Sequence, residues 1–182
     1  FPGEDAAVSI SCVGGYPAEG GAAADPSANV SAITGSDAHR LMVIGDKAKV
    51  SFKGVSFTHS LTAVSGEPAL IFAKGAEVSM TDCKVTDNVN NNGTKYSTCA
   101  GISVQADVKV SFTGCEFARN AASWGASLIL RGDATVRNCN FHDNMGVNGP
   151  GNSLYVDPST AEVVVDGCTF RNNTASDTHG GA

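Results

Sequence analysis

One segment of eleven residues occurs five times in this chain with the same layout, and this repeat constrains the fold more than any other feature. The copies occupy residues 50–60, 78–88, 110–120, 134–144 and 163–173. Their sixth residues are Val55, Cys83, Cys115, Cys139 and Cys168, which gives successive intervals of 28, 32, 24 and 29 residues. A constant unit with variable spacing is typical of repeat proteins in which insertions are confined to loops.

Each copy has the hydrophobic pattern of two short strands joined by a corner. In the first copy, apolar residues alternate at Val50 and Phe52 and again at Val55 and Phe57, as in strands with one buried face. Gly, Asp or Asn stands between the two pairs in every copy, and these residues tolerate the left-handed backbone of a corner. A further apolar stretch, such as residues 70–72, precedes each later copy. We therefore expect about three strands per repeat.

Three strands per repeat, stacked along an axis, would form the coils of a parallel β-helix. We predict an all-β fold, a right-handed parallel β-helix (β-solenoid) of about five coils, with the hand taken from the usual chirality of parallel connections. Residues 1–38 are expected to form an N-terminal cap or irregular segment. Residues 39–182 are expected to form the β-helix repeats, which we expect to continue beyond residue 182. An antiparallel β-sandwich is the alternative, but it does not explain why equivalent positions carry the same residue types.

Equivalent positions of successive copies should stack as columns inside the β-helix. Asparagine ends four of the five copies, and its amide can bond both its neighbours and the backbone of the corner. A cysteine thiol at a buried position packs as a small hydrophobe. The predicted columns are Asn88, Asn120, Asn144 and Asn173; Phe117, Phe141 and Phe170; and Cys83, Cys115, Cys139 and Cys168.

The pairing of Phe-x-x-Asn at 117–120, 141–144 and 170–173 with Gly-Gly-Ala at 180–182 resembles the repeat of chlamydial polymorphic outer membrane proteins. Similar repeats occur in large surface proteins of algae and protists. The resemblance covers about residues 50–182 and implies a β-helical surface protein with an adhesive role. The first two copies depart from the pattern, because Ser60 replaces the asparagine and Val85 replaces the phenylalanine.

Two cysteines, Cys12 and Cys99, lie outside the repeated positions. We expect this pair to form a disulfide that ties the N-terminal segment to the β-helix. The cysteine and histidine spacings match none of the usual zinc patterns, and no cofactor is expected.

Composition narrows the partners and the compartment. The formal net charge is -6 and only 16% of residues are charged, so few cations are present to neutralise phosphates and nucleic acid is not expected as a partner. No run of about 20 apolar residues is present, so no segment is expected to span a membrane. Sequons at Asn29, Asn92 and Asn172 predict N-glycosylation. Together with the fold, they favour a secreted or cell-surface (extracellular) glycoprotein.

Loops on a rigid scaffold are where contacts are usually made, and two loops carry most of the irregular surface. In the loops 89–98 and 145–151, the predicted binding residues are Asn90, Asn91, Lys95, Tyr96 and Asn148. The favoured function is a non-enzymatic structural or adhesive module, a rigid spacer or building block of a surface assembly or filament. Its expected partners are other protein chains, joined end to end or laterally, and surface glycans.

A carbohydrate-active β-helix enzyme, such as a polysaccharide lyase or epimerase, is the alternative function. Enzymes of this kind need several titratable side chains from adjacent coils that converge in a groove. The candidate cluster is Arg119, His142, Asp143 and Arg171. A solvated corner of mixed charge explains the same residues, so both interpretations stand at this point.

An outward row of hydroxyl groups at Ser51, Ser79, Ser111 and Thr135 is also expected on one face. Such a row is one requirement of an ice-binding surface. Val164 ends the row and charged residues flank it, which disfavours that function.

Overall fold

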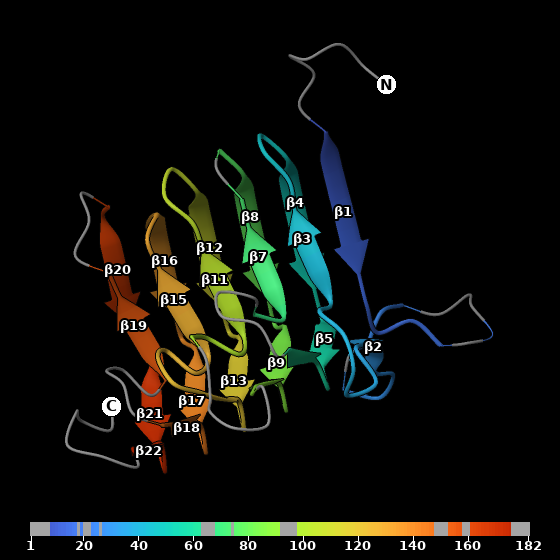
Figure 1. Cartoon of the computed structure of the whole chain (residues 1–182). Helices are drawn as coiled ribbons and strands as arrows, with labels where there is room; N and C mark the ends of the chain where they lie inside the picture. Colours follow the sequence, from blue (N-terminus) through green and yellow to red (C-terminus); the bar gives the residue numbers. More distant parts are fainter. Residues whose placement is uncertain are drawn as a thin grey trace.

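The computed structural model describes residues 8–17, 19, 23–25, 27–62, 68–73, 75–91, 98–147, 153–157 and 161–175. All regular secondary structure in these ranges is β-structure, arranged as four parallel sheets (Figure 1). Within the same ranges, no helix of the length and apolarity needed to cross a membrane is present.

Two of the sheets contain six strands each. Sheet A consists of β1 (Ser9–Val13), β4 (Lys49–Lys53), β8 (Glu77–Thr81), β12 (Lys109–Thr113), β16 (Asp133–Arg137) and β20 (Val163–Asp166). Sheet B consists of β2 (Ser31–Thr34), β5 (Val55–Thr58), β9 (Lys84–Thr86), β13 (Glu116–Ala118), β17 (Asn140–His142) and β21 (Thr169–Arg171).

The other two sheets contain five strands each. Sheet C consists of β3 (Met42–Ile44), β7 (Leu70–Phe72), β11 (Ile102–Val104), β15 (Leu128–Leu130) and β19 (Leu154–Val156). Sheet D consists of two-residue strands, β6 (Leu61–Thr62), β10 (Val89–Asn90), β14 (Ala121–Ala122), β18 (Met145–Gly146) and β22 (Thr174–Ala175).

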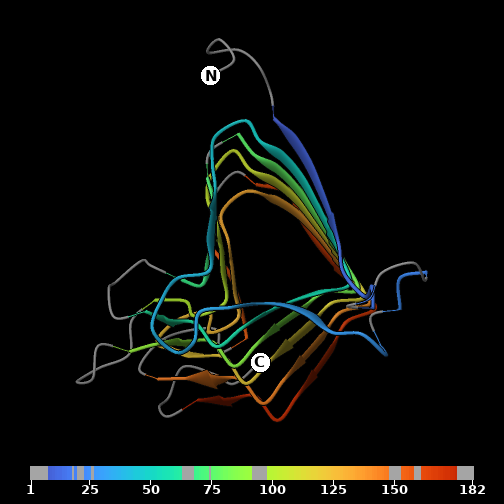
Figure 2. The ribbon, with the colours of Figure 1, turned by 90° about the vertical axis from the view of Figure 1, so that its right-hand side faces the viewer.

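The chain visits the sheets in the order A, B, D, C and then returns to A, so that each circuit is one coil of a parallel β-helix (Figure 2). Four circuits, β4–β7, β8–β11, β12–β15 and β16–β19, are complete. This arrangement confirms the predicted fold class. It corrects one detail, because a coil has four strands instead of three. Within residues 1–38, expected to form a cap or irregular segment, β1 and β2 pair in register with β4 and β5.

The corner between sheets A and B requires left-handed backbone, as the sequence predicts. The second residue of the break has a positive φ in every copy: Gly54 (63°), Asp82 (52°), Gly114 (63°), Asn138 (53°) and Gly167 (62°). A second left-handed corner precedes sheet D, at His59, Asp87, Arg119, Asp143 and Asn172. A corner at the end of each copy was expected from the asparagine column. Its left-handed backbone was not predicted, because the residue types at these positions vary from copy to copy.

The interior is built from columns of equivalent side chains. The rings of Phe117 and Phe141 are stacked with centroids 4.7 Å apart, and those of Phe141 and Phe170 are stacked at 4.8 Å. Phe117 also meets the ring of Phe112 edge-on at 5.5 Å. Because offset stacking and edge-to-face contacts are both favourable for aromatic rings, the column joins the coils along the axis.

A column of asparagines runs beside the aromatic one, at the corner that precedes sheet D. Asn88, Asn120 and Asn144 are fully buried. The Nδ2 of Asn120 donates to Oδ1 of Asn144 at 3.2 Å and to the carbonyl of Val85 at 2.8 Å, while its Oδ1 accepts from Nδ2 of Asn88 at 3.0 Å. The same pattern continues from Asn144 to Asn173. Each buried amide thus satisfies polar groups of two neighbouring coils, which removes a large desolvation cost.

The thiols form a third column. Cys83, Cys115 and Cys139 are buried, Cys168 is partly buried, and all six cysteines are free. The thiol of Cys115 forms hydrogen bonds with the thiols of Cys139 and Cys83. These hydrogen bonds, together with burial, hold the pKa of Cys115 well above its usual value. Burial also raises the pKa of Cys99 to about 12. Buried thiols with a raised pKa, such as those of Cys115 and Cys99, are unreactive.

The expected Cys12–Cys99 disulfide is not present. Cys12 lies on β1 in sheet A, where it pairs in register with Phe52 of the next coil. Cys99 lies two coils further along, between β10 and β11, and its thiol donates to the carbonyl of Ile102 at 3.1 Å. The two side chains therefore belong to different coils and different sides of the β-helix, beyond the reach of a disulfide.

We expect six thiols per chain to react with a thiol reagent when the protein is unfolded in denaturant without reductant. In the folded protein Cys83, Cys99, Cys115 and Cys139 should not react, since they are buried. Titration of thiols in the folded and unfolded states measures both numbers. A count of four or fewer after unfolding would show that a disulfide exists.

Candidate interaction surfaces

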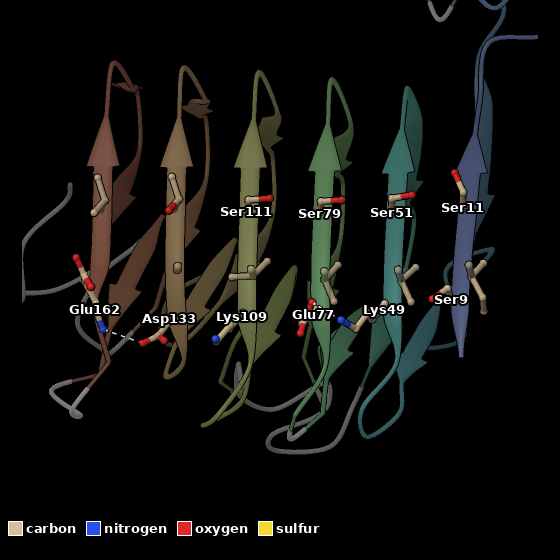
Figure 3. Close-up of a pocket in the computed structure, with 17 residues that line it drawn as sticks. Ser9, Ser11, Lys49, Ser51, Glu77, Ser79, Lys109, Ser111, Asp133 and Glu162 are labelled. Carbon is tan, nitrogen blue, oxygen red and sulfur yellow. Dashed lines mark hydrogen bonds and ion pairs between the residues drawn. The ribbon is translucent and has the colours of Figure 1, made fainter. Parts of the chain in front are cut away.

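The outer face of sheet A is hollowed. It forms an open groove of about 770 Å³ that crosses all six strands. The central row of this groove, here called the hydroxyl row, consists of Ser11, Ser51, Ser79, Ser111, Thr135 and Val164, which are in register across the sheet (Figure 3). Because these side chains are short, they form the floor of the groove.

Charged side chains line one edge of the groove. This charged row consists of Ser9, Lys49, Glu77, Lys109, Asp133 and Glu162, one residue from each successive coil (Figure 3). Nζ of Lys49 lies 3.1 Å from Oε2 of Glu77, and the backbone N–H of Glu162 donates to Oδ1 of Asp133 at 3.0 Å. At the opposite edge Nε of Arg137 lies 3.8 Å from Oδ2 of Asp166.

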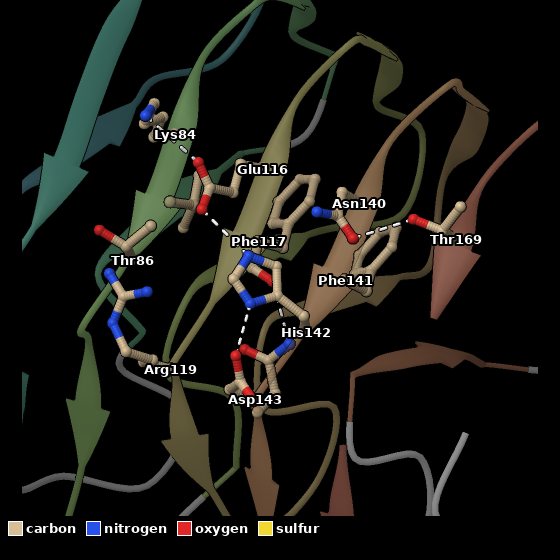
Figure 4. A network of polar contacts seen from close by, with 12 residues as sticks. Lys84, Thr86, Glu116, Phe117, Arg119, Asn140, Phe141, His142, Asp143 and Thr169 are labelled. Carbon is tan, nitrogen blue, oxygen red and sulfur yellow. Dashed lines mark hydrogen bonds and ion pairs between the residues drawn. The ribbon is translucent and has the colours of Figure 1, made fainter. Parts of the chain in front are cut away.

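A second polar surface lies on the outer face of sheet B and joins three coils (Figure 4). Nζ of Lys84 lies 3.3 Å from Oε2 of Glu116, and Oε1 of Glu116 lies 3.0 Å from Nε2 of His142. Nδ1 of His142 lies 2.7 Å from Oδ2 of Asp143. His142 is only 7% exposed, and each of its ring nitrogens contacts a carboxylate of the fold.

The carboxylates of this surface are stabilised in their ionised form. Partial burial opposes ionisation of Glu116, but hydrogen bonds from His142 and Lys84 and their charges outweigh it and hold the pKa of Glu116 below its usual value. Partial burial likewise opposes ionisation of Asp87. Its two hydrogen bonds from the Arg119 guanidinium, at 2.6 and 2.8 Å, nevertheless bring the pKa of Asp87 below its usual value.

These depressed pKa values predict acid destabilisation. A group with a lowered pKa in the folded state stabilises the fold above its unfolded pKa, about 3.9 for Asp and 4.3 for Glu. That contribution disappears as the pH falls through the folded pKa. The melting temperature should therefore be nearly constant from pH 7 to about 5 and should fall steeply towards pH 2.

The variant Asp87→Asn should have a shallower dependence in this acid range, with a lower melting temperature at pH 7. Melting curves between pH 2 and 7 for both proteins measure the difference. Identical slopes would show that the Asp87–Arg119 pair does not contribute.

The cluster predicted as a possible catalytic site is only partly assembled. His142 and Asp143 are in direct contact. Arg119, however, forms its bidentate pair with Asp87, and Arg171 lies exposed on the next coil, in register with His142. The predicted cluster left out Lys84, Glu116 and Asp87. Lys84 and Glu116 occupy equivalent positions of neighbouring copies, and Asp87 occupies the position of Arg119, so the repeat could have revealed both pairs.

The predicted loop contacts are largely outside the described residues. Lys95, Tyr96 and Asn148 belong to that part. Asn90 is fully buried, and its Nδ2 donates to the carbonyls of Thr98 and Cys99, both at 3.0 Å. Its position is therefore a correction: Asn90 ties the two ends of its loop together and is not available for a partner. Asn91 is half-buried at the end of β10.

The three sequons differ in their surroundings. Asn172 is exposed at a left-handed corner, and Thr174 of the same sequon is exposed on β22. Asn29 is half-buried, and the hydroxyl of Ser31 in its sequon accepts a hydrogen bond from the N–H of Gly15 at 3.0 Å. Asn92 lies outside the described residues. Of the two described acceptors, Asn172 is thus the more open.

Comparison with known families gives the same architecture. A family model described as a right handed beta helix region matches residues 21–181. The chain belongs to this family. The match gives the β-helix its right-handed sense and includes residues 21–38, which the sequence analysis placed outside the helix. Searches of curated proteins and of solved structures found no match.

Proposed function

We propose that this β-helix is a non-enzymatic structural or adhesive module of a secreted or cell-surface glycoprotein. In this role it is a rigid spacer or building block of a surface assembly. The observation that carries the proposal is the open groove on the outer face of sheet A, which has a floor of mostly hydroxyl side chains, crosses all six strands and has charged residues along both edges. A face of this size and regularity suits contact with another extended surface.

The interior supports the proposed mechanical role. Asparagine, aromatic and thiol columns run through the coils, so each coil is bonded to the next by side chains as well as by backbone ladders. Stability of a solenoid depends on such contacts between nearest neighbours. The resemblance of the Phe-x-x-Asn repeat to chlamydial polymorphic outer membrane proteins supports the adhesive form of the proposal.

One observation favours the alternative, a carbohydrate-active enzyme. His142 has a carboxylate at each ring nitrogen, and many enzymes use an imidazole next to a carboxylate for proton transfer. Here Glu116, Asp143 and the imidazole satisfy one another, and Lys84 and Arg119 are bound to carboxylates as well. The network therefore holds neighbouring coils together, and we assign it that structural role.

The two functions are separated by assaying a panel of neutral and acidic polysaccharides for cleavage and for unsaturated products. We expect no turnover by the wild-type protein. Reproducible turnover that is lost in the double variant His142→Ala, Asp143→Ala, and kept in Thr169→Ala on the same outer face, would overturn the proposal. A melting curve of each variant shows whether it is folded.

The glycoprotein part of the proposal predicts modification at Asn172. When the chain is expressed through a eukaryotic secretory pathway, the variant Asn172→Gln should lose the mass of one N-glycan. The variant Thr174→Ser should keep it, because serine also completes the sequon. Both proteins carry Asn29→Gln and Asn92→Gln, so that only Asn172 can be glycosylated. Equal glycan masses with and without Asn172→Gln would contradict this assignment.

A further inference from the structure

The charges of the charged row alternate from Lys49 to Asp133, and the whole row is complementary to itself when it is reversed. From the first strand of sheet A to the last, the row reads Ser9, Lys49, Glu77, Lys109, Asp133 and Glu162. All six side chains are exposed on the outer face. When the row is read backwards against itself, lysine meets carboxylate at four of the six positions and serine meets Glu162 at the other two.

We propose that a second copy of this chain docks on the outer face of sheet A, with the two sheets face to face. The two copies are related by a two-fold axis that runs parallel to the strands and passes between β8 and β12. The inference names the partner of the face used in the proposed function and therefore rests on it. Two-fold self-complementary contacts are the commonest kind in protein dimers.

This axis places each residue of one copy opposite a defined residue of the other. Glu77 lies opposite Lys109 on both sides of the axis, and Lys49 lies opposite Asp133 further out. In the hydroxyl row Ser79 lies opposite Ser111. The small side chains of that row let the sheets approach, while the longer charged side chains meet along the edge of the groove.

Other registers place like charges together. A shift by one strand in one direction puts Lys49 opposite Lys109 and Glu77 opposite itself. A shift in the other direction puts Glu77 opposite Asp133 and Lys109 opposite itself. A two-fold axis that is instead parallel to the helix axis puts Lys49 of one copy opposite Lys53 of the other. Because like-charge contacts are penalised strongly in an interface, the row favours a single arrangement.

Like charges remain together at the opposite edge of the groove, where Lys53 of each copy faces Arg137 of the other. Within its own copy Arg137 is bound to Asp166, and this carboxylate then lies diagonally across from Lys53. Thr81 and Thr113 face each other at the centre of the same edge. This edge therefore contributes little, and the charged row determines the arrangement.

The size of the face limits how strongly two copies can associate. Six strands about 4.8 Å apart and five residues of about 3.3 Å along each strand give roughly 400 Å² of sheet per copy. Stable protein interfaces usually bury more than this, so a weak dimer is expected, with a dissociation constant on the order of 100 µM at low salt. Charge pairs at an exposed edge are screened, and about 0.5 M salt should weaken the dimer by roughly tenfold.

Sedimentation equilibrium of the whole chain at several concentrations and two salt concentrations tests the proposal. We expect a concentration-dependent dimer at low salt. The variant Lys109→Glu places two carboxylates on each side of the axis and should weaken the dimer by at least tenfold. Lys84→Glu, with the same change of charge on sheet B, is the matched control and should behave as wild type.

A full inversion gives the sharpest result. The quadruple variant Lys49→Glu, Glu77→Lys, Lys109→Glu and Asp133→Lys keeps the alternation within the sheet and the complementarity between copies. It should associate with itself as wild type does, but it should not associate with the wild-type protein. All four positions are exposed, so the fold should tolerate the change, and a melting curve verifies this.

Two results would overturn the proposal: a wild-type protein that stays monomeric at about 1 mM and low salt, or a Lys109→Glu variant that dimerises as well as wild type. Binding between the inverted and wild-type chains would also contradict it. These outcomes are independent of the polysaccharide assay. A monomer without turnover leaves the structural proposal intact, and a dimer with turnover overturns only that proposal.

Discussion

Replacing Asn120 with alanine is expected to lower the free energy of unfolding by about 3–5 kcal/mol. The side chain is fully buried, and its amide bonds Asn88, Asn144, the carbonyl of Val85 and the hydroxyl of Ser127. Each buried polar group left without a partner costs about 1–3 kcal/mol, and this change leaves several. Denaturant unfolding at neutral pH measures the difference.

Asn140→Ala is the matched control, because it removes the same side chain from the outer face of sheet B. Asn140 is partly exposed, and its Oδ1 accepts one hydrogen bond from Thr169 at 2.9 Å. A loss below about 1 kcal/mol is expected there. Equal losses in the two variants would refute the ladder as a source of stability.

Replacing Phe141 with alanine is expected to cost about 3–5 kcal/mol, because the change leaves a cavity in a close-packed column. The ring is fully buried and stacked on both faces, against Phe117 at 4.7 Å and Phe170 at 4.8 Å. Urea unfolding of the variant measures the loss.

Phe170→Ala provides the comparison for this column. Phe170 is 39% exposed, and within the described part of the chain it has an aromatic neighbour on only one face. The expected loss is about 1–2 kcal/mol, since less of the ring is buried. If Phe141→Ala cost no more than Phe170→Ala, stacking between coils would not explain the stability of the column.

The β-helix could be predicted from the sequence because its repeat places the same residue types at the same positions of each coil. Alternating apolar residues predicted the strands of sheets A and B, and Gly, Asp or Asn predicted the corner between them. Sheet D was missed because strands such as Val89–Asn90 have two residues, too few for a periodic pattern. β1 was missed because Ser9–Val13 is not followed by the rest of the repeat.

Contacts between coils were harder to predict than the coils themselves. His142 and Asp143 are adjacent in sequence and were recognised, but Glu116 meets His142 only because β13 pairs with β17. The charged row stands one residue before each copy of the repeat, and its complementarity depends on the order of the coils in space. Loop contacts such as that of Asn90 depend on where the two ends of a loop meet, which the sequence does not specify.

The free thiols bear on the compartment. Free cysteines are usual in reducing compartments, and disulfides are usual outside the cell. In this β-helix Cys83, Cys115 and Cys139 are buried, and burial protects thiols from oxidation. The column is therefore compatible with an extracellular location.

Labelling of intact producing cells with an amine reagent that does not cross membranes tests the central claim most directly. Lys84 and Lys109 are exposed on two different faces of the β-helix, so the folded protein should react readily. The account predicts that mass spectrometry finds both lysines labelled before lysis. Labelling that appears only after lysis would place the protein inside the cell and would contradict a structural or adhesive role at the surface.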